Sequence, residues 1–368
     1  MQQPYERRLF SLRSLLAYHQ LDGIIIASPA NIYYYSGFSG EDSWLFIGRS
    51  AIGLLTDGRY TEQAAKECPE VPVFCQGGNH GNWVTLLAEI CQQENIQKLA
   101  FEGAVFTFQQ FVEMRDGLNP NEKQQVLLYD AKELLLQGRL IKEEEELECL
   151  RKVAAIGDDV MKMIEKYLRP GITEKEIARE IDYAFLSLGA ERTSFPTIVA
   201  AGKNGAKPHA KPSDYLLKAG DLVTMDFGGV YQGYCGDMTR TVAIGYADEK
   251  QKELYQLVLQ AQTYAVANLR AGMTTHEADA LARDIIADAG YGEYFSHSLG
   301  HGVGLEIHEH PFVRKNGQEV LAVGQVVTVE PGIYIPDWGG IRIEDTVVIT
   351  EKGAVPFNHY PKQLRCFS

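Results

Sequence analysis

The sequence of 368 residues lacks the features that mark membrane, secreted and nucleic-acid-binding proteins. No apolar run reaches the roughly 18 residues that a membrane-spanning helix needs. The start, MQQPYERRLFSLRSLL, has no apolar stretch followed by a cleavage site, so we do not expect secretion. Positive charge is also scarce, since 35 Lys and Arg residues stand against 49 Asp and Glu residues, a net charge of −14. Such a surface repels phosphate backbones and anionic lipid, which argues against nucleic acid and membranes as partners.

Cysteine is sparse and scattered. No two of the six cysteines form a C-x-x-C pair, and they are spread over the chain at Cys68, Cys75, Cys91, Cys149, Cys235 and Cys366. A disulfide framework or a thiolate zinc site would cluster them. We therefore expect free thiols in a reducing cytoplasm.

The length and the pattern of elements predict two domains, because one domain takes about 150 residues. The N-terminal part alternates strand-like and helix-like segments. Strands are expected at 22–27, 44–48, 51–56 and 98–102, and helices at 5–19, 82–94 and 106–115. This alternation indicates a mixed α/β domain, which we place at residues 1–135.

A long amphipathic helix at 139–168 is expected to open the second domain, residues 136–368. Its apolar residues recur at helical spacing, at Leu147, Leu150, Val153, Ala154 and Met161. The acidic run 143–146 stands at the helix start, where negative charge favours the helix dipole. We interpret this run as a solvated first turn.

The C-terminal domain repeats itself. Residues 168–176 (LRPGITEKE) and 269–277 (LRAGMTTHE) share the pattern L-R-x-G-x-T-x-x-E, in which Gly ends one helix and a capping box opens the next. Later segments correspond in the same order: 222–231 with 326–334, and 241–244 with 346–349. We therefore predict an α+β fold in which two units of helices and a β-hairpin are related by a pseudo-twofold axis.

Four acids occupy matched positions on these two hairpins: Asp226, Asp237, Glu330 and Glu344. An acid within an apolar strand is costly to bury unless it is paired or bound to a cation. Four converging carboxylates cannot all stay ionised at neutral pH without positive charge between them. A separate salt bridge could account for the burial of any one of these acids. A pair of divalent cations accounts for all four acids at matched positions of the two hairpins.

Histidines gather close to the second pair of acids. His297, His301, His308 and His310 lie within HSLGHGVGLEIHEHP, whose glycines allow the backbone to fold closely around a site. A lone histidine is more often a core or surface residue, whereas a cluster beside acids favours a functional role. His209, in a Gly/Pro/Lys loop before the first hairpin, is either a further site residue or an exposed loop residue.

These residues carry a family pattern. HSLGHGVGLEIHE (297–309) resembles the signature of proline dipeptidases and aminopeptidase P, the metallopeptidases with the pita-bread fold, and GIRIED (340–345) also matches. NIYYYSGFSG (31–40) and TDGRYTEQA (56–64) resemble the small N-terminal domain shared by prolidases, aminopeptidase P and creatinase. The resemblance covers the whole chain and implies a pita-bread catalytic domain after a creatinase/prolidase-like domain.

The resemblance also implies the roles of site residues. Five metal ligands are expected, in the chain order Asp226, Asp237, His301, Glu330 and Glu344. His209 and His308 fall where the family has two active-site histidines that are not ligands. We expect His308 to stabilise an oxyanion, His209 to contact the substrate or leaving amine, and Glu330 to accept a proton. The hard, oxygen-rich ligand set favours two Mn²⁺ ions, with Co²⁺, Fe²⁺ or Zn²⁺ as alternatives.

The implied reaction is hydrolysis of an Xaa-Pro bond in a small peptide whose second residue is proline, by a homodimer. We favour a proline dipeptidase, because the compact length resembles bacterial prolidases. The alternatives are an aminopeptidase P that acts on longer peptides and a non-catalytic pita-bread binding protein. The binding protein is disfavoured because all five ligand positions are filled.

A dipeptidase must also hold the free carboxylate that follows proline. Arg342 stands two residues before Glu344, so both side chains lie on one strand face. Arg342 is therefore either a substrate-binding residue or a structural residue that orients the neighbouring acids. Arg314, in the turn after HEHP, is the weaker candidate.

Overall fold

A computed structural model describes residues 4–77, 81–120 and 125–368. The chain divides into two compact units, Met1–Arg139 and Leu140–Ser368. The boundary expected from the sequence, between residues 135 and 136, falls inside helix α6 (Lys132–Leu140), whereas the division falls at the end of that helix. No helix in the described ranges is both long and apolar enough to span a bilayer.

The N-terminal unit is built on one mixed six-stranded sheet. The strand order is β4-β3-β2-β1-β5-β6, in which β1 pairs antiparallel with β2 and parallel with β5. The strands are β1 (Gly23–Ile26), β2 (Trp44–Gly48), β3 (Ile52–Thr56), β4 (Val73–Cys75), β5 (Lys98–Phe101) and β6 (Leu127–Asp130). The helices are α1 (Pro4–Tyr18), α2 (Pro29–Ser36), α3 (Thr61–Glu67), α4 (Trp83–Gln93) and α5 (Phe108–Leu118).

All four strands and all three helices expected in this unit are confirmed. Helices α2 and α3 and the short strands β4 and β6 were not predicted from the sequence. Helix α2 is eight residues long and largely buried, so it shows no amphipathic period. Its start is set by Ser28, whose side chain accepts a hydrogen bond from the backbone N–H of Asn31.

The C-terminal unit contains two pairs of long helices: α7 (Glu144–Ile164) with α8 (Glu174–Ser187), and α9 (Glu249–Asn268) with α10 (Thr275–Asp288). The two predicted capping boxes are confirmed, Thr173 with Glu176 before α8 and Thr274 with Glu277 before α10. Three short 3-10 helices complete the helical set: η2 (Glu165–Tyr167), η3 (Gly202–Ala206) and η4 (Gly292–Tyr294).

The amphipathic helix expected over 139–168 is present as α7 over Glu144–Ile164, but its expected start is wrong. The chain breaks between α6 and α7, because Glu143 is extended and forms a capping box with Glu146. The acidic run is not wholly solvated either. Glu146 is buried, and it accepts a hydrogen bond of 3.1 Å from the hydroxyl of Tyr234.

Two larger sheets carry the repeated hairpins. The first has the order β20-β12-β9-β8, and the second has the order β14-β13-β15-β18-β19. The antiparallel pairs β9/β12 and β15/β18 are the predicted hairpins. Their strands are β8 (Ile198–Ala201), β9 (Leu222–Phe227), β12 (Met238–Ile244), β20 (Cys366–Phe367), β13 (Gly300–Gly302), β14 (Glu309–Val313), β15 (Val326–Val329), β18 (Asp345–Thr350) and β19 (Gly353–Pro356).

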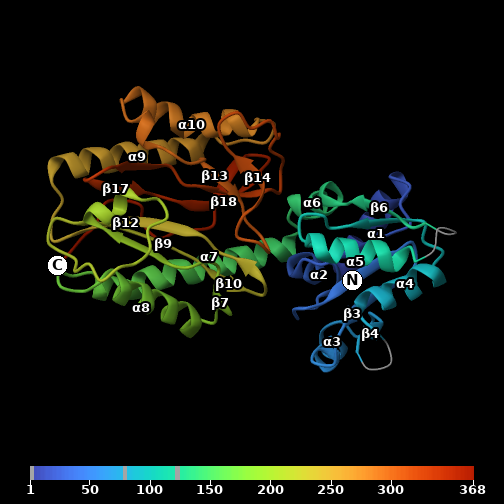
Figure 1. The fold of residues 1–368 in the computed structure, drawn as a ribbon. Helices are drawn as coiled ribbons and strands as arrows, with labels where there is room; N and C mark the ends of the chain where they lie inside the picture. The colour runs from blue at the N-terminus through green and yellow to red at the C-terminus, as the bar shows by residue number, and fades with distance from the viewer. Residues whose placement is uncertain (1–3, 78–80, 121–124) are drawn as a thin grey trace. The chain divides into compact units, whose positions relative to one another are not determined.

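Two small sheets extend the hairpins. One joins β7 (Arg192–Thr193), β10 (Gly229–Tyr231) and β11 (Tyr234–Cys235), and the other joins β16 (Gly332–Ile335) and β17 (Gly339–Arg342). Within this unit the sheets lie between α9 and α10 on one side and α7 and α8 on the other (Figure 1). The predicted α+β class with a duplicated C-terminal domain is confirmed.

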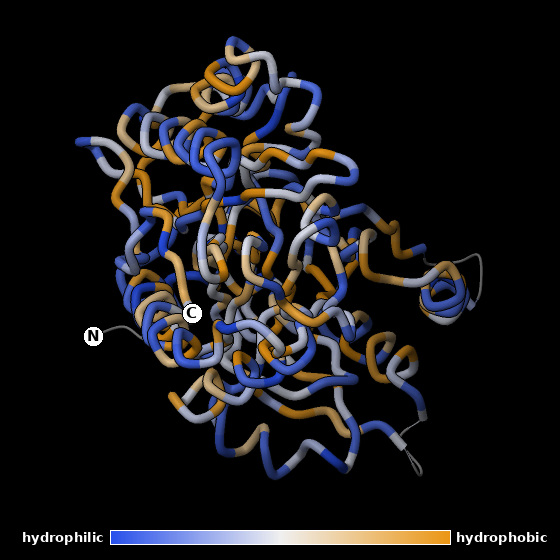
Figure 2. Tube along the Cα trace, turned by 90° about the vertical axis from the view of Figure 1, so that its left-hand side faces the viewer, coloured by the Kyte–Doolittle hydropathy of each residue, from blue (hydrophilic) through white to orange (hydrophobic). Residues whose placement is uncertain are grey.

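Each pair of helices closes its own apolar core. The buried side chains Val160 and Ile181 pack in one cluster with Val223 and Val242 of the first hairpin. A second cluster joins helix residues to the other hairpin: Val258, Ala282, Val327 and Val347. Hydrophilic and hydrophobic residues alternate along the helical turns of the trace, as expected of amphipathic helices (Figure 2). Burial of each such aliphatic side chain contributes about 1.5–3 kcal/mol.

In each of the repeated segments 222–231 and 326–334, the β-strand is broken near an acid. Gly228 separates β9 from β10, and a Cβ there would lie 1.8 Å from the carbonyl oxygen of Gly236. Pro331 lies between β15 and β16 and has no N–H to continue the ladder. These breaks leave Asp226 near the end of β9 and Glu330 just after β15.

Candidate metal centre

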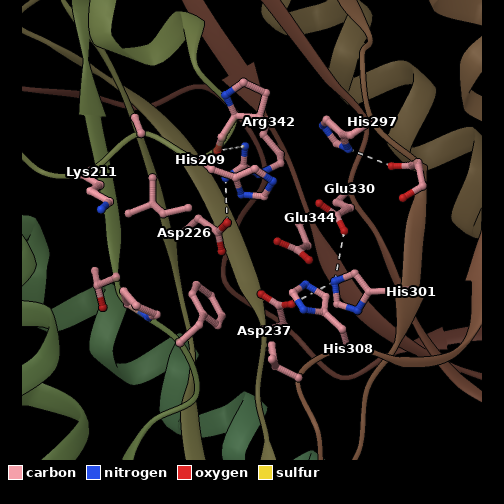
Figure 3. Close-up of a pocket in the computed structure, with 18 of the residues that line it drawn as sticks. His209, Lys211, Asp226, Asp237, His297, His301, His308, Glu330, Arg342 and Glu344 are labelled. Atoms are coloured by element: carbon pink, nitrogen blue, oxygen red, sulfur yellow. Dashed lines mark hydrogen bonds and ion pairs between the residues drawn. The ribbon is translucent and has the colours of Figure 1, made fainter. Parts of the chain in front are cut away.

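A cavity of about 390 Å³ in the C-terminal unit is lined by all eight site residues named from the sequence. They are His209, Asp226, Asp237, His301, His308, Glu330, Arg342 and Glu344, and Figure 3 shows the acids and His301 turned toward one another. The structure therefore brings together residues that are widely separated in the sequence. The roles assigned to them remain predictions.

The repeated hairpins explain why the acids converge. Asp226 lies near the end of β9 and Asp237 just before β12, while Glu330 follows β15 and Glu344 precedes β18. Each hairpin thus supplies one acid from the end of its first strand and one from the start of its second. Carboxylate oxygens of Asp226, Asp237 and Glu344 all lie within 4.8 Å of one another.

His301, on β13, faces this cluster with one ring nitrogen. Its Nε2 lies 3.5 Å from Oδ2 of Asp237 and 3.4 Å from Oε1 of Glu330. Its Nδ1 lies 3.0 Å from the carbonyl oxygen of Gly302, which places the ring proton on Nδ1. Burial lowers the pKa of His301 to about 4, so the ring is neutral at pH 7 and its Nε2 lone pair faces the acids. A neutral imidazole held in this way is the form that binds a metal ion.

In the metal-free fold, burial and mutual repulsion disfavour ionisation of all four carboxylates at once. Burial raises the pKa of Glu330 to about 8, with Arg342 opposing the shift and Asp226 adding to it. Burial, followed by repulsion from neighbouring acids, holds the pKa values of Asp237 and Glu344 well above their ordinary values. Positive charge among these carboxylates would relieve both the burial cost and the repulsion.

Two orphaned oxygens show where a cation fits. Oδ1 of Asp226 and Oε1 of Glu344 are buried, and no donor in the described part of the chain hydrogen-bonds to either. An unsatisfied buried carboxylate oxygen is costly, and coordination to a metal ion would satisfy it. Four carboxylates and one neutral imidazole also form a hard donor set suited to divalent first-row metals. The residues present therefore fit a site for divalent metal ions.

Arg342 orients two of the acids. Its Nη2 donates to Oδ2 of Asp226 at 2.7 Å, and its Nε donates to the hydroxyl of Thr239 at 3.0 Å. The Thr239 hydroxyl donates in turn to Oε2 of Glu344 at 2.6 Å. Arg342 is buried, and its Nη1 donates to the hydroxyl of Tyr334 at 2.7 Å. The geometry supports the orienting role for Arg342, and its substrate-binding role remains a prediction.

His209 and His308 lie at the cavity with their ring nitrogens uncommitted. Both are exposed, and neither ring forms a hydrogen bond with another residue of the described ranges. The ring centroid of His308 lies 4.3 Å from that of His301. Partial burial and the nearby ring of His209 lower the pKa of His308, which favours the neutral imidazole with its one N–H donor. Both rings are free to contact a bound substrate.

Two residues that support this arrangement, His297 and Tyr334, had no role predicted from the sequence. Nε2 of His297 lies 2.8 Å from the hydroxyl of Tyr334, the same hydroxyl that binds Arg342. Burial lowers the pKa of His297 to about 3, and burial raises the pKa of Tyr334 to about 12. His297 was noted within the histidine cluster, whereas no sequence signal marked Tyr334 as its partner.

The apolar wall of the cavity was not predicted. It comes from two separate segments, 195–198 and 307–312, with the side chains Phe195, Pro196, Ile198, Ile307 and Phe312. Lys211, two residues after His209, also lines the cavity. Two other residues considered from the sequence, His310 and Arg314, are not among its lining. His310 instead places Nδ1 2.7 Å from Oε1 of Glu319.

Comparison with known proteins agrees with this geometry. The profile of metallopeptidase family M24 matches residues 148–351, and the profile of the creatinase/prolidase N-terminal domain matches residues 8–141. The Xaa-Pro dipeptidase of Pyrococcus furiosus is 38% identical, over 98% of this chain and 99% of its own.

Two solved structures are similar over nearly the full length of both chains. The Xaa-Pro dipeptidase from Bacillus anthracis has a TM-score of 0.93 and 37% identity, and the match covers 98% of this chain and 99% of the other. The X-Pro aminopeptidase from Thermotoga maritima has a TM-score of 0.90 and 34% identity, and the match covers 97% and 99%. The chain therefore belongs to metallopeptidase family M24, with a creatinase/prolidase N-terminal domain preceding the metallopeptidase domain.

Proposed function

We propose that this protein hydrolyses the Xaa-Pro bond of dipeptides, with two divalent metal ions held in the cavity described above. The observation that carries the proposal is the convergence of four acids on a neutral His301, with two buried carboxylate oxygens unsatisfied among the described residues. Similarity to Xaa-Pro dipeptidases over nearly the whole chain supports the choice of substrate.

Five residues would hold the metal ions: Asp226, Asp237, His301, Glu330 and Glu344. When bound, such ions supply Lewis acidity, which polarises a substrate carbonyl and lowers the pKa of a water molecule. The contacts of Arg342 and Thr239 with Asp226 and Glu344 would keep these ligands aligned.

Three side chains would handle the substrate and its protons. A carboxylate oxygen of Glu330 would accept the proton of the attacking water and pass it to the leaving amine. The neutral ring of His308 would donate its N–H to the developing oxyanion. His209, free of hydrogen bonds to described residues, would contact the substrate or the leaving amine.

The shape of the cavity suits a small peptide that contains proline. Phe195, Ile198 and Phe312 form apolar surface beside the acids, and this surface suits a pyrrolidine ring. Proline at the second position offers no N–H, so apolar contact takes the place of a backbone hydrogen bond.

We further propose Mn²⁺ as the bound metal, because carboxylate-rich sites favour hard ions. Co²⁺, Fe²⁺ and Zn²⁺ are the alternatives, and elemental analysis of the purified protein would separate them. A reducing cytoplasm remains a prediction from the scattered cysteines of the sequence. A homodimer remains a prediction from the family resemblance, to be tested by analytical ultracentrifugation.

A second candidate function is that of an aminopeptidase P acting on longer peptides. The observation in its favour is the structural similarity to the X-Pro aminopeptidase from Thermotoga maritima. A non-catalytic binding protein is disfavoured, because all five ligand positions are filled and converge.

The deciding experiment is hydrolysis of a panel of peptides with added Mn²⁺. We expect higher kcat/KM for Xaa-Pro dipeptides than for Xaa-Pro-Yaa tripeptides. Amidation of the dipeptide carboxylate should cost about 1.5–3 kcal/mol, the scale of a hydrogen bond to a charged group. Equal cleavage of tripeptides without a penalty for amidation would identify an aminopeptidase P. No cleavage of any Xaa-Pro peptide by metal-loaded protein would refute both functions.

A further inference from the structure

The cavity contains very little positive charge. Among the described residues that line it, the cationic side chains are Lys211 and Arg342. Arg342 is buried, and its three nitrogens already bind Asp226, Thr239 and Tyr334. Lys211 is exposed and forms no hydrogen bond or ion pair with another residue of the described ranges. Of the two cations, only the ammonium group of Lys211 has all of its donors available to a ligand.

We propose that Lys211 binds the free α-carboxylate of the dipeptide substrate. This inference rests on the proposed function and names the residue that makes the protein a dipeptidase. The sequence suggested Arg342 for this contact with the carboxylate. Lys211 was marked in the sequence only by its position in the loop that contains His209.

The backbone on either side of Lys211 is held in place. Ala210 is buried, and the carbonyl of Pro208 accepts a hydrogen bond of 3.3 Å from Nη1 of Arg342. On the other side, the N–H and the hydroxyl of Ser213 donate to Oε2 of Glu174 at 2.8 and 2.6 Å. Glu174 is itself fully buried. The loop therefore presents the side chain of Lys211 from a fixed base, which lowers the entropy cost of binding.

The position of Lys211 within the cavity suits the leaving half of the substrate. In Figure 3, Asp226 lies between Lys211 and the part of the cluster formed by Glu330 and His301. A scissile carbonyl at the acid cluster would leave the proline carboxylate to extend toward the cavity wall. A carboxylate at that wall would add negative charge beside the acids, and of the two cationic side chains that line the cavity Arg342 is already engaged. Lys211 is the cation placed to meet it.

The matched control lies in the same loop. Lys207 is also exposed, carries the same charge, and places its Nζ 3.4 Å from Oδ1 of Asn204, but it does not line the cavity. Lys207→Met removes one positive charge close to Lys211 without removing the proposed contact. A comparison of the two variants therefore separates direct binding from a general electrostatic effect.

The experiment measures kcat and KM of the metal-loaded full chain on an Xaa-Pro dipeptide and on its C-terminal amide. Lys211→Met should raise KM for the dipeptide about 10–100-fold, leave kcat nearly unchanged, and have little effect on the amide. The preference for the free carboxylate should therefore disappear. Lys211→Arg should restore most of it, and Lys207→Met should behave as the wild type. Metal content and thermal unfolding confirm that each variant is folded and loaded.

Two results would overturn the assignment of Lys211 alone. In the first, the wild type cleaves the dipeptide and Lys211→Met keeps the full preference for the free carboxylate. In the second, Lys207→Met loses as much of that preference as Lys211→Met does. A wild type that cleaves neither the dipeptide nor its amide would instead overturn the proposed function, and the Lys211 assignment with it.

Discussion

Arg342 and Asp226 form an ion pair between the two halves of the C-terminal unit, with Nη2 2.7 Å from Oδ2 and side-chain exposures of 3% and 13%. The other oxygen of Asp226, Oδ1, is buried and has no donor among the described residues. One carboxylate therefore has one oxygen fixed by a guanidinium and the other free to bind a cation. This arrangement links the orientation of a metal ligand to a residue on the opposite hairpin.

Arg342→Lys tests whether Arg342 orients the ligands or binds the substrate. A lysine ammonium cannot reach Asp226, Thr239 and Tyr334 together, because those contacts use the planar fork of a guanidinium. We expect losses of about 10–100-fold in metal affinity and in kcat, measured by metal titration and steady-state kinetics. Arg314→Lys, on an exposed residue outside the cavity lining, is the control. A rise in KM alone, with metal affinity unchanged, would show that Arg342 binds substrate instead.

Asp237→Asn and Glu344→Gln should lose bound metal and turnover together. Each replacement removes a charged ligand from a site that depends on carboxylate charge to hold cations. Chelation should abolish wild-type activity, and Mn²⁺ should restore it in the wild type but not in the variants. Elemental analysis and turnover are measured on the same samples. Glu249→Gln, on an exposed residue at the start of α9, should change neither quantity. Full activity in metal-free protein would contradict the site.

His308→Ala should retain both metal ions and lower kcat by about 10²–10³, the usual cost of one oxyanion donor. The ring of His308 lies beside that of His301 and forms no hydrogen bond with another described residue. Its removal should therefore leave the metal ligands in place. Metal content is measured beside the kinetics. If the variant loses metal, His308 is a ligand and its predicted role is wrong.

His209→Ala should likewise keep its metal, while kcat/KM for the dipeptide falls. His209 lines the cavity from a loop outside both hairpins, so its loss should leave the four acids in place. Steady-state kinetics with metal analysis checks the result. A wild-type rate would mean that His209 is only an exposed loop residue.

Metal binding by the chelated protein at pH 7 should release protons. The pKa of Glu330 rises from its ordinary value of 4.5 to about 8 in the metal-free fold, so this carboxyl is largely protonated at pH 7. It must lose that proton to become a ligand. Calorimetric titration with Mn²⁺ in two buffers of different ionisation enthalpy measures the number of protons released. Identical heats in both buffers would contradict the prediction.

The raised pKa of Glu330 also makes the free energy of unfolding of the metal-free protein depend on pH. A carboxyl whose folded pKa lies above its unfolded value contributes stability below about pH 4.5, and this contribution is lost as pH rises toward 8. The metal-free protein should therefore lose stability between pH 5 and 8, and bound metal should remove that dependence. Chemical denaturation with and without Mn²⁺ measures the effect. Equal slopes in the two series would argue against the buried acid cluster.

The features that the sequence determined are local or repeated. Helical spacing placed the buried face of α7, and the pattern Thr-x-x-Glu placed the starts of α8 and α10. Because the hairpins repeat in order, matched acids such as Asp226 and Glu330 could be expected to meet. Spacing along the chain carries this information, since it follows from the geometry of helices and strands.

Contacts between side chains of separate segments became visible in the three-dimensional packing alone. The spacing of Arg342 left open whether it orients the acids or binds the substrate, and only the packing showed that its fork binds Asp226 and leaves Lys211 as the available cation. The burial of Glu146 beneath Tyr234 was equally hidden, because an acidic run at a helix start looks the same whether solvated or covered. These contacts depend on how loops and hairpins pack in three dimensions, and the pattern of residues along the chain does not contain that packing.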